Sequence, residues 1–368
     1  MTGPGFKNNR VRCIRPFTTM ELQPGGEVSF CCVEWAKAPY IGNVQNQSLT
    51  EIWNSDAAQY IRRKMLAGEW EDVCRPGVCP TLVSEGWKEL TTDGAGKKLF
   101  VLTERHIKDI QAGRTRMSAS PTYVLMSNLE ACNLKCPMCG PFRNIYTENR
   151  NDAPFDCAVE KQREIMEGEN MAVLERISGD VVNGLPDLKV LGLCGAGDPL
   201  FRPDTRKILF SKDKRVRPEI ALFTNGLLFN SKMWKKIKHN AFRYVNVSVD
   251  AAAKDTYEKV RPPGKWDDIV ANLEFLSDLR AQGKIPQLFI NFTVMRSNLE
   301  EMTDFVRLGE RLKVDSVYFQ KIRGIIRNRE NFFDGPDKDQ ELLDRLEIIK
   351  PQAKKAAGGK TAVAFGNV

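Results

Sequence analysis

The sequence predicts an α/β protein built as a partial (βα)6 TIM-like barrel with a small N-terminal cysteine-rich domain. Two observations predict the barrel. From residue 121 onward, short apolar runs of strand length alternate with amphipathic helical patterns, and there are six such units, too few for a closed eight-stranded barrel. A third observation predicts the front domain, because five of the ten cysteines lie within the first 82 residues.

The overall composition is that of a globular chain. Its 368 residues are 42% hydrophobic and 28% charged, which suits one large core plus a smaller domain and excludes a disordered protein. The first residues lack the apolar stretch of a secretory signal, and no long uncharged apolar segment follows. We therefore predict a cytoplasmic protein without membrane contact, whose reduced cysteines serve as metal ligands or catalytic groups.

The net charge of +8 is concentrated in three basic segments, 211–219, 231–239 and 320–330. Such segments attract anionic partners, but aromatic side chains are not interleaved with the charges as a base-stacking platform requires. We interpret the segments mainly as solvated faces of surface helices. A nucleic acid partner is therefore disfavoured.

Residues 1–82 are predicted to form the small, loop-rich domain, with one helix over 48–68. Ser48 is the predicted N-cap of that helix, and Glu51 three residues later completes a capping box. A domain of this kind needs a staple such as a bound metal. Residues 83–120 are predicted to be a connector that includes a possible strand at 98–103.

Residues 121–368 are predicted to form the barrel domain. Its strands are predicted at 123–129, 188–195, 219–225, 244–250, 287–295 and 316–322. Helical patterns fill each gap, and one of them, which begins at Trp266, ends on Gly283. Since parallel strands leave their carboxyl ends on one face, the loops that follow them should converge there and build a site.

The loops on that face carry polar and glycine-rich clusters. They are the cysteine loop after the first strand and then "GAGDP" (195–199), "TNG" (224–226), "SVDA" (248–251) and "MRSN" (295–298). The cysteine loop, "CNLKCPMC", holds Cys132, Cys136 and Cys139. Three thiolates can hold three irons of a 4Fe-4S cluster and leave the fourth iron open for a small molecule. The alternatives are a zinc site completed from elsewhere and purely structural cysteines, although His106 and His239 are not in a zinc-binding pattern.

"CNLKCPMC" resembles the CxxxCxxC signature of the radical S-adenosylmethionine (SAM) enzymes, and the resemblance extends over roughly residues 121–325. It implies that Cys132, Cys136 and Cys139 ligate a 4Fe-4S cluster whose open iron binds S-adenosylmethionine. It also implies reductive cleavage to a 5′-deoxyadenosyl radical, which abstracts hydrogen from a substrate carbon. The implied electron donor is a flavodoxin or ferredoxin.

The same resemblance implies which residues contact the cofactor. "GAGDP" stands where the family has a GGEP-like motif, with Ala196 in place of a glycine and Asp198 in place of the usual glutamate. The implied cofactor-binding residues are Met138, Gly195, Ala196, Gly197, Asp198, Thr224, Asn225, Ser248, Asp250, Arg261 and Asn298. Arg261 suits the cofactor carboxylate because a guanidinium donates a forked pair of hydrogen bonds. Cys194, at the end of the second strand, is a candidate catalytic hydrogen-atom donor, with a buried apolar cysteine as the alternative.

The front segment resembles the SPASM/Twitch auxiliary-cluster domain. The resemblance rests on "CIRPF", "GGEVSFCCVEW", "IGNVQNQSLTEIWNS" and "CRPGVC", and the domain here precedes the barrel, whereas in most relatives it follows it. It implies one auxiliary 4Fe-4S cluster, the second cluster of the chain, with a structural zinc as the alternative. The implied ligands are Cys13, Cys31, Cys74 and Cys79, with Cys32 as an alternative to Cys31 because adjacent strand residues face opposite ways.

These resemblances predict a radical SAM oxidoreductase. An auxiliary cluster that collects the electron of the substrate radical implies net oxidation or cross-linking of a peptide or protein side chain. The alternative is radical oxidation or epimerisation of a sugar-like or nucleotide-linked small molecule. From a different class, the alternative is a non-catalytic iron-sulfur or zinc protein that binds nucleic acid.

Overall fold

The computed structural model describes residues 11–23, 26–37, 39–75, 79, 101–127, 131–139, 176–194, 197–212, 217–322, 330–333, 337–366 and 368. The chain divides into two compact units. One comprises residues 1–129, 165–195 and 203–220, and the other comprises 130–164, 196–202 and 221–368. Both contain parallel strands with connecting helices, so the predicted fold class, α/β with a parallel sheet, is confirmed.

The first unit is built on strands in the order β5-β4-β1-β2-β3. β4 (Tyr123–Met126) pairs in parallel with both β5 (Val190–Leu193) and β1 (Thr19–Leu22). β2 (Glu27–Ser29) and β3 (Tyr40–Asn43) follow as antiparallel strands. All four residues of β1 are buried, so their backbone groups need a partner strand, and β4 supplies it. The cysteine-rich front segment therefore shares a sheet with the first predicted barrel strand.

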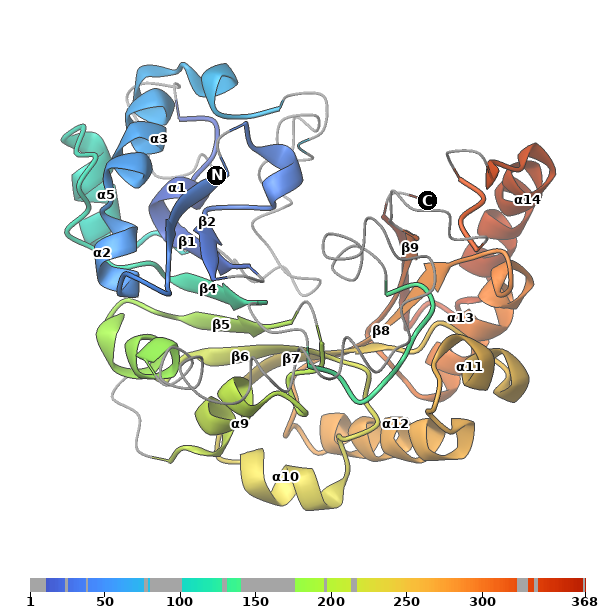
Figure 1. Ribbon diagram of the computed structural model, residues 1–368. Coiled ribbons are helices and arrows are strands. Elements are labelled where there is room, and N and C mark those ends of the chain that lie inside the picture. Colours follow the sequence, from blue (N-terminus) through green and yellow to red (C-terminus); the bar gives the residue numbers. More distant parts are fainter. Residues whose placement is uncertain are drawn as a thin grey trace. The chain divides into compact units, whose positions relative to one another are not determined.

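Helices complete the first unit, and among those in the described ranges α3 is the longest. Their bounds are α1 (Arg15–Thr18), η1 (Val33–Trp35), α2 (Leu49–Trp53), α3 (Asp56–Ala67), η2 (Trp70–Asp72), α5 (Glu104–Gln111), η3 (Asp180–Gly184) and α9 (Pro203–Phe210). Figure 1 shows α2, α3 and α5 gathered at the front segment of the chain.

The predicted single helix over 48–68 is wrong, although its predicted start is confirmed. Ser48 Oγ accepts from Glu51 N at 3.3 Å, and Glu51 Oε2 accepts from Ser48 N at 2.8 Å, which is the expected capping box. The helix then stops at Asn54, because the backbone leaves the helical region there and at Ser55, where ψ is 163°. Asn54 Oδ1 accepts from Met117 N at 2.8 Å. Ser55 begins α3 as a second N-cap, its Oγ accepting from Ala58 N at 3.1 Å.

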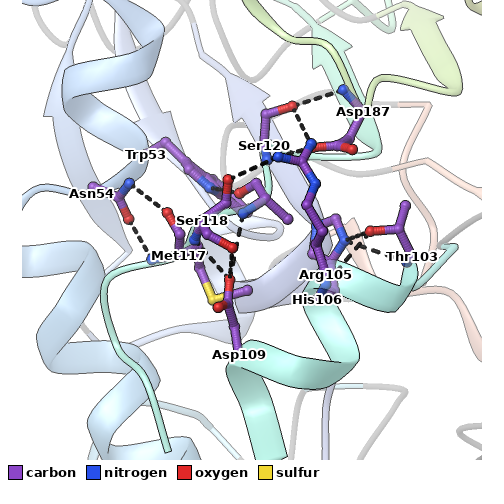
Figure 2. Close-up of polar contacts among 11 residues, drawn as sticks. Trp53, Asn54, Thr103, Arg105, His106, Asp109, Met117, Ser118, Ser120 and Asp187 are labelled. Carbon is purple, nitrogen blue, oxygen red and sulfur yellow. Dashed lines mark hydrogen bonds and ion pairs between the residues drawn. The ribbon is translucent and has the colours of Figure 1, made fainter. Parts of the chain in front are cut away.

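The described part of the predicted connector, residues 101–120, is closely bonded to the rest of its unit (Figure 2). The buried carboxylate of Asp109 accepts hydrogen bonds from Ser118 N at 2.6 Å and from Ser118 Oγ at 2.9 Å. Asp187 Oδ2 accepts from Ser120 N at 2.8 Å. Short polar side chains thus fix a Gly/Arg/Ser-rich stretch that carries few apolar anchors of its own. The predicted boundaries at residues 82 and 120 stay predictions.

The second unit carries the later strands in parallel. β7 (Phe242–Ser248), β8 (Leu288–Val294), β9 (Ser316–Lys321) and β10 (Ala362–Phe365) pair in that order. β6 (Glu219–Thr224) has residues in both units. The six predicted strands are thus all present as β4 to β9. β10 was not predicted, because "AVAF" is too short and too small in volume to stand out as a strand.

Helices pack on one side of these strands, where the core of the second unit lies. Phe292 of β8 has its ring centroid 4.8 Å from that of Phe305 and 5.4 Å from that of Phe319. Figure 1 shows α12 and α13 along β8 and β9. The bounds are α10 (Ser231–Ile237), α11 (Lys254–Val260), α12 (Trp266–Ala281), η4 (Leu299–Glu301), α13 (Met302–Arg311) and α14 (Gln340–Ala356).

The other face of the same strands carries the aromatic pair Tyr244 and Phe289 and becomes polar toward the carboxyl ends of the strands. Ser248, Asn291 and Tyr318 are register neighbours on β7, β8 and β9, and they alternate with the buried residues Val247, Ile290 and Val317. The carboxyl ends of the strands and this polar face therefore supply the side chains from which a site can be built.

None of the helices in the described ranges has both the length and the apolar character that crossing a bilayer requires.

We predict that Asp109→Asn lowers the free energy of unfolding at pH 7 by about 2 kcal/mol, because it removes the charged acceptor of the Ser118 donors. Burial acts to raise the pKa of Asp109, but the hydrogen bonds from Ser118 and Arg114 outweigh it and hold the pKa below its ordinary value. A carboxyl with a lowered folded-state pKa stabilises the fold above about pH 4 and loses that effect as the pH falls further. Urea unfolding at pH 7 and at pH 3 should show a smaller acid loss in the variant than in the parent, and an equal loss in both would contradict this role.

Candidate functional site

The three cysteines of the CxxxCxxC motif lie in the second unit on a loop, residues 131–139, that contains neither helix nor strand. Inside the loop, Cys139 N donates to Cys136 O at 3.1 Å. From outside, the Pro262 carbonyl oxygen accepts from Lys135 N at 2.6 Å. The loop therefore depends on the segments around it for its shape.

Gly197 packs directly against this loop. Its φ is +107°, and a Cβ added to it would lie 2.3 Å from the Ala131 carbonyl oxygen, so only glycine fits. Asp198 N donates to the same oxygen at 2.9 Å. The described part of the "GAGDP" motif thus supports the start of the cysteine loop, whereas the predicted cofactor contacts Gly195 and Ala196 lie outside the described residues.

The Asp198 carboxylate is buried and bonded to the ends of neighbouring segments. It accepts from Thr224 Oγ1 and from Asn225 N, both at 2.7 Å, and from Leu200 N at 2.9 Å. Burial raises the pKa of Asp198, while these donors act in the opposite direction. Asp198 and Thr224 therefore tie the "GAGDP" and "TNG" loops together, and their contact with a cofactor stays a prediction.

Asn225 reaches from the "TNG" loop to the cysteine loop. Its Nδ2 donates to Asn133 Oδ1 at 2.8 Å and lies 3.7 Å from Cys132 Sγ. Its Oδ1 accepts from Leu227 N at 3.1 Å, which fixes the amide orientation. Asn225 is thus placed to hold the first cysteine and to donate a hydrogen bond to its sulfur.

Asp250 organises the loops after β7 and β8. It has a φ of +62°, its Oδ1 accepts from Thr293 N at 2.7 Å, and its other oxygen forms an ion pair with Arg261. Asn298 Nδ2 donates to Asp250 O and to Thr293 O, both at 2.9 Å. Both amide hydrogens of Asn298 are thereby used within these loops, so the structure shows it as a tie between them.

Two buried donors near Cys136 have no hydrogen-bond partner among the described residues, Arg261 Nε and Tyr257 Oη. Burial raises the pKa of Cys136, and the charge of Arg261 opposes that effect, which places the guanidinium close to this thiol. Buried donors normally find partners, so an anionic group bound at the cysteine loop fits this arrangement. Sequence reasoning named Arg261 but missed Tyr257, whose position four residues before Arg261 on a helical pattern was the available signal.

The three thiols of the loop differ in exposure, since Cys136 is buried, Cys132 is half-buried and Cys139 is exposed. Burial in the first place, and the nearby carboxylate of Asp198 in the second, raise the pKa of Cys132 to about 12. A metal ligand must be a thiolate, and a bound metal ion supplies the positive charge that stabilises a thiolate in such a place. No three His, Cys, Asp or Glu side chains in the described ranges converge on one metal ion, but a cubane does not require this, since each of its irons takes its own cysteine.

The other predicted residues occupy different surroundings. The partly buried side chain of Met138 packs against a core cluster in the second unit, formed by Val260, Met295 and Ile322. Ser248 lies at the end of β7 on the polar face of the strands. Cys194 follows β5 in the first unit, where it is half-buried and its N donates to Met126 O at 3.3 Å. Cofactor contact for Met138 and Ser248, and a catalytic role for Cys194, stay predictions.

The first unit contains a second group of cysteines around one mainly apolar pocket. Four of the five predicted front ligands line it, Cys13, Cys31, Cys74 and Cys79. Burial raises the pKa of Cys74 to about 12, and the charges of Cys13 and Cys79 act on it as well, so these thiols are close neighbours. Four thiols around one pocket are the donor set of a fully ligated 4Fe-4S cluster.

Cys32, the alternative to Cys31, is not among the residues that line this pocket. It follows Cys31 at the start of η1, as the N-cap residue of that turn. The structure also brings in a residue that sequence reasoning did not single out. Arg15, two positions after Cys13, lines the same pocket.

We predict that Gly197→Ala displaces the cysteine loop, because the new Cβ would overlap the backbone of Ala131. Anaerobically reconstituted protein should then lose about four of about eight irons, with the front pocket keeping its own. The matched control is Gly359→Ala, since Gly359 has a φ of +91° but nothing within 4 Å of the added carbon. Equal iron contents in the two variants would contradict this role for Gly197.

We predict that Cys31→Ser removes the cluster of the front pocket, whereas Cys32→Ser keeps it, because only Cys31 lines the pocket. Iron and sulfide analysis should show a loss of about four irons in the first variant alone. The reverse result would assign the ligand to Cys32.

Comparison with known proteins gives two family matches. The model described as the radical SAM superfamily matches residues 129–309, and the SPASM model, described as an iron-sulfur cluster-binding domain, matches residues 13–80. These ranges contain the cysteine loop of the second unit and the four-cysteine pocket of the first.

Similar proteins include a probable GTP 3′,8-cyclase of Saccharolobus islandicus, 25% identical over 171 residues, which are 46% of this chain and 54% of that protein. Molybdenum cofactor biosynthesis protein 1 of Drosophila melanogaster is 25% identical over 198 residues, 53% of this chain and 30% of that protein. The chain spans about half the length of the first of these relatives. Among solved structures, Streptococcus suis SuiB bound to S-adenosylmethionine matches with a TM-score of 0.45 and 13% identity, covering 88% of this chain and 66% of that one.

The open three-cysteine loop and the four-cysteine pocket lie where the two family models match. With a SPASM domain at its front, this chain belongs to the radical SAM superfamily of iron-sulfur enzymes.

Proposed function

We propose that this chain is an oxidoreductase that cleaves S-adenosylmethionine at the three-cysteine loop and removes a hydrogen atom from a substrate carbon. The observation that carries the proposal is the loop with Cys132, Cys136 and Cys139, next to which two buried donors have no hydrogen-bond partner in the described part of the chain. Three thiolates leave one iron of a 4Fe-4S cluster open to a small-molecule ligand. When bound there, the cluster and S-adenosylmethionine supply one electron and the 5′-deoxyadenosyl radical.

The protein's part in this chemistry is to bind and orient. We assign Arg261 to the carboxylate of S-adenosylmethionine, because its guanidinium is held by Asp250 and its Nε has no partner among the residues that the structure describes. Asn225 orients Cys132 through the contact of Nδ2 with Sγ at 3.7 Å. Burial of Cys136, which is 6% exposed, keeps water from that side of the loop.

We assign a second 4Fe-4S cluster to the pocket lined by Cys13, Cys31, Cys74 and Cys79. Because each of its four irons would carry a cysteine thiolate, this cluster would have no free coordination site for a substrate. We therefore assign it a role in electron transfer. Accepting the electron of the substrate radical would make the net reaction an oxidation or a cross-link. A flavodoxin or ferredoxin is the proposed donor for the open cluster.

For the substrate, we propose a peptide or protein side chain, since the front segment resembles auxiliary-cluster domains that mostly serve such reactions. The second candidate is a sugar-like or nucleotide-linked molecule. It is favoured by the names of relatives such as the probable GTP 3′,8-cyclase and by the three basic segments of the sequence. A non-catalytic nucleic-acid-binding protein is the least favoured, because the radical SAM match argues for an enzyme.

We predict that replacing Cys132, Cys136 and Cys139 together by alanine abolishes release of 5′-deoxyadenosine but leaves the front cluster. Anaerobic reconstitution should give about eight irons in the parent and about four in the variant. Chromatography of the dithionite-reduced protein with S-adenosylmethionine measures the cleavage. Stable zinc in place of iron, with no cleavage by the parent, would overturn the proposed function.

The substrate classes are separated by a labelling experiment. Each candidate is offered with deuterium at its carbon-bound positions, and deuterium in 5′-deoxyadenosine identifies the one that gives up hydrogen. Transfer from a peptide supports the first proposal, and transfer only from a nucleotide or sugar supports the second.

A further inference from the structure

Arg15 is a buried cation in the wall of the four-cysteine pocket. It is the first residue of α1, and its side chain is only 16% exposed. It lines the pocket with the four cysteines and with Trp35, whose ring centroid lies 5.4 Å from Arg15 Cζ. Among the described residues that line the pocket, Arg15 is the one charged side chain.

Glu21 on β1 holds this cation in place. Arg15 Nη1 donates to Glu21 Oε1 at 2.8 Å, and the Glu21 side chain is only 9% exposed. The charge of Arg15 acts on the thiols of Cys13 and Cys31, which places it within electrostatic reach of two ligands. Most of the other lining residues are apolar or sulfur-bearing, so the pocket screens this charge far less than water does.

We propose that Arg15 is a positioning residue for the auxiliary cluster, a fixed positive charge that favours the reduced state of the cluster, with Glu21 as the counter-charge that limits this effect. The inference rests on the proposed function in one respect, the presence of a 4Fe-4S cluster in the pocket. Net charge and nearby polar groups set the reduction potential of such clusters. Arginine suits the task because it stays protonated at all physiological pH values.

A positive charge at Arg15 favours electron transfer from the substrate radical to a cluster in the pocket. Hydrogen abstraction by the 5′-deoxyadenosyl radical leaves a substrate radical and 5′-deoxyadenosine. Loss of one electron and one proton would convert this substrate radical to the oxidised product, and a cluster held by Cys13, Cys31, Cys74 and Cys79 would take up the electron while solvent takes up the proton. Because reduction adds negative charge to a group already ligated by four thiolates, a buried cation beside it makes that transfer more favourable.

The test compares four single substitutions in full-length protein that carries the triple alanine replacement of the SAM-cluster cysteines, so that only the auxiliary cluster is observed. Arg15→Met removes the cation, Arg15→Lys keeps it, and Glu21→Gln removes the counter-charge. Lys37→Met is the matched control, because Lys37 acts on Cys74 electrostatically but is exposed to solvent. Iron content is measured first, and the reduction potential is then followed by electron paramagnetic resonance during a redox titration at pH 8.

At a fixed potential we expect Arg15→Met to lower the ratio of reduced to oxidised cluster at least tenfold, which is about 59 mV for one electron. Glu21→Gln should raise the ratio, while Arg15→Lys and Lys37→Met should change it less than about threefold. If Arg15 and Glu21 had a purely structural role, the reduction potentials of Arg15→Met and Glu21→Gln would not shift in opposite directions.

Failure of the proposal and failure of the proposed function are distinguishable. If the parent binds no iron in the pocket, the proposed auxiliary cluster falls and this inference with it. If the parent binds about four irons, an unchanged potential in Arg15→Met, or a shift of Arg15→Met and Glu21→Gln in the same direction, overturns the role of Arg15 alone. If Arg15→Met does not retain iron, Glu21→Gln decides, because the proposal fails unless that variant has a raised potential.

Discussion

The candidate SAM site depends on the contact between Gly197 and the Ala131 carbonyl oxygen. The cysteine loop has no helix or strand to define it, so neighbouring backbone must do so. A Cβ on residue 197 would lie 2.3 Å from that oxygen, so the contact leaves room for glycine alone. Asp198 N, Asn225 Nδ2 and the Pro262 carbonyl oxygen add hydrogen bonds at further points along the loop. The segments that follow β5, β6 and α11 thereby support the loop that carries the three thiols.

Each of the two cysteine groups has a buried or partly buried ion pair beside it. Partly buried thiols resist ionisation, as the raised pKa values of Cys132 and Cys74 show. Each group has an arginine beside it that is held by an acidic residue. Arg261 is paired with Asp250 near the three-cysteine loop, and Arg15 is paired with Glu21 near the four-cysteine pocket. An ion pair of this kind fixes a positive charge in apolar surroundings. A buried charge without a counter-charge would be very costly in free energy. Within the described ranges, Arg261 Nε has no hydrogen-bond partner, which suits a cofactor contact.

Several residues that were predicted to contact the cofactor join loops or pack in the core in the structure. Asp198, Thr224 and Asn298 use their polar atoms to join loops, and the side chain of Met138 enters a hydrophobic cluster. Motif position alone does not distinguish a residue that touches a ligand from one that holds such a residue, because both need the same polar side chain at a strand end. The opposite case also occurs, because motif position did not mark Tyr257 or Arg15 as site residues. Tyr257 lies near Cys136, and Arg15 lines the pocket of the four front cysteines.

The sequence by itself determined the fold class, the six parallel strands, the capping box at Ser48 and the two groups of cysteines. These features are local, because periodicity, caps and ligand spacing are written in neighbouring residues. Tertiary structure decided what depends on distant partners. It placed β1 beside β4, divided the predicted helix at Asn54 and Ser55, and lined the front pocket with Cys31 and not with Cys32. It also brought Arg15 and Glu21 together, because strand pairing and burial bring side chains into contact that their separation in the sequence does not reveal.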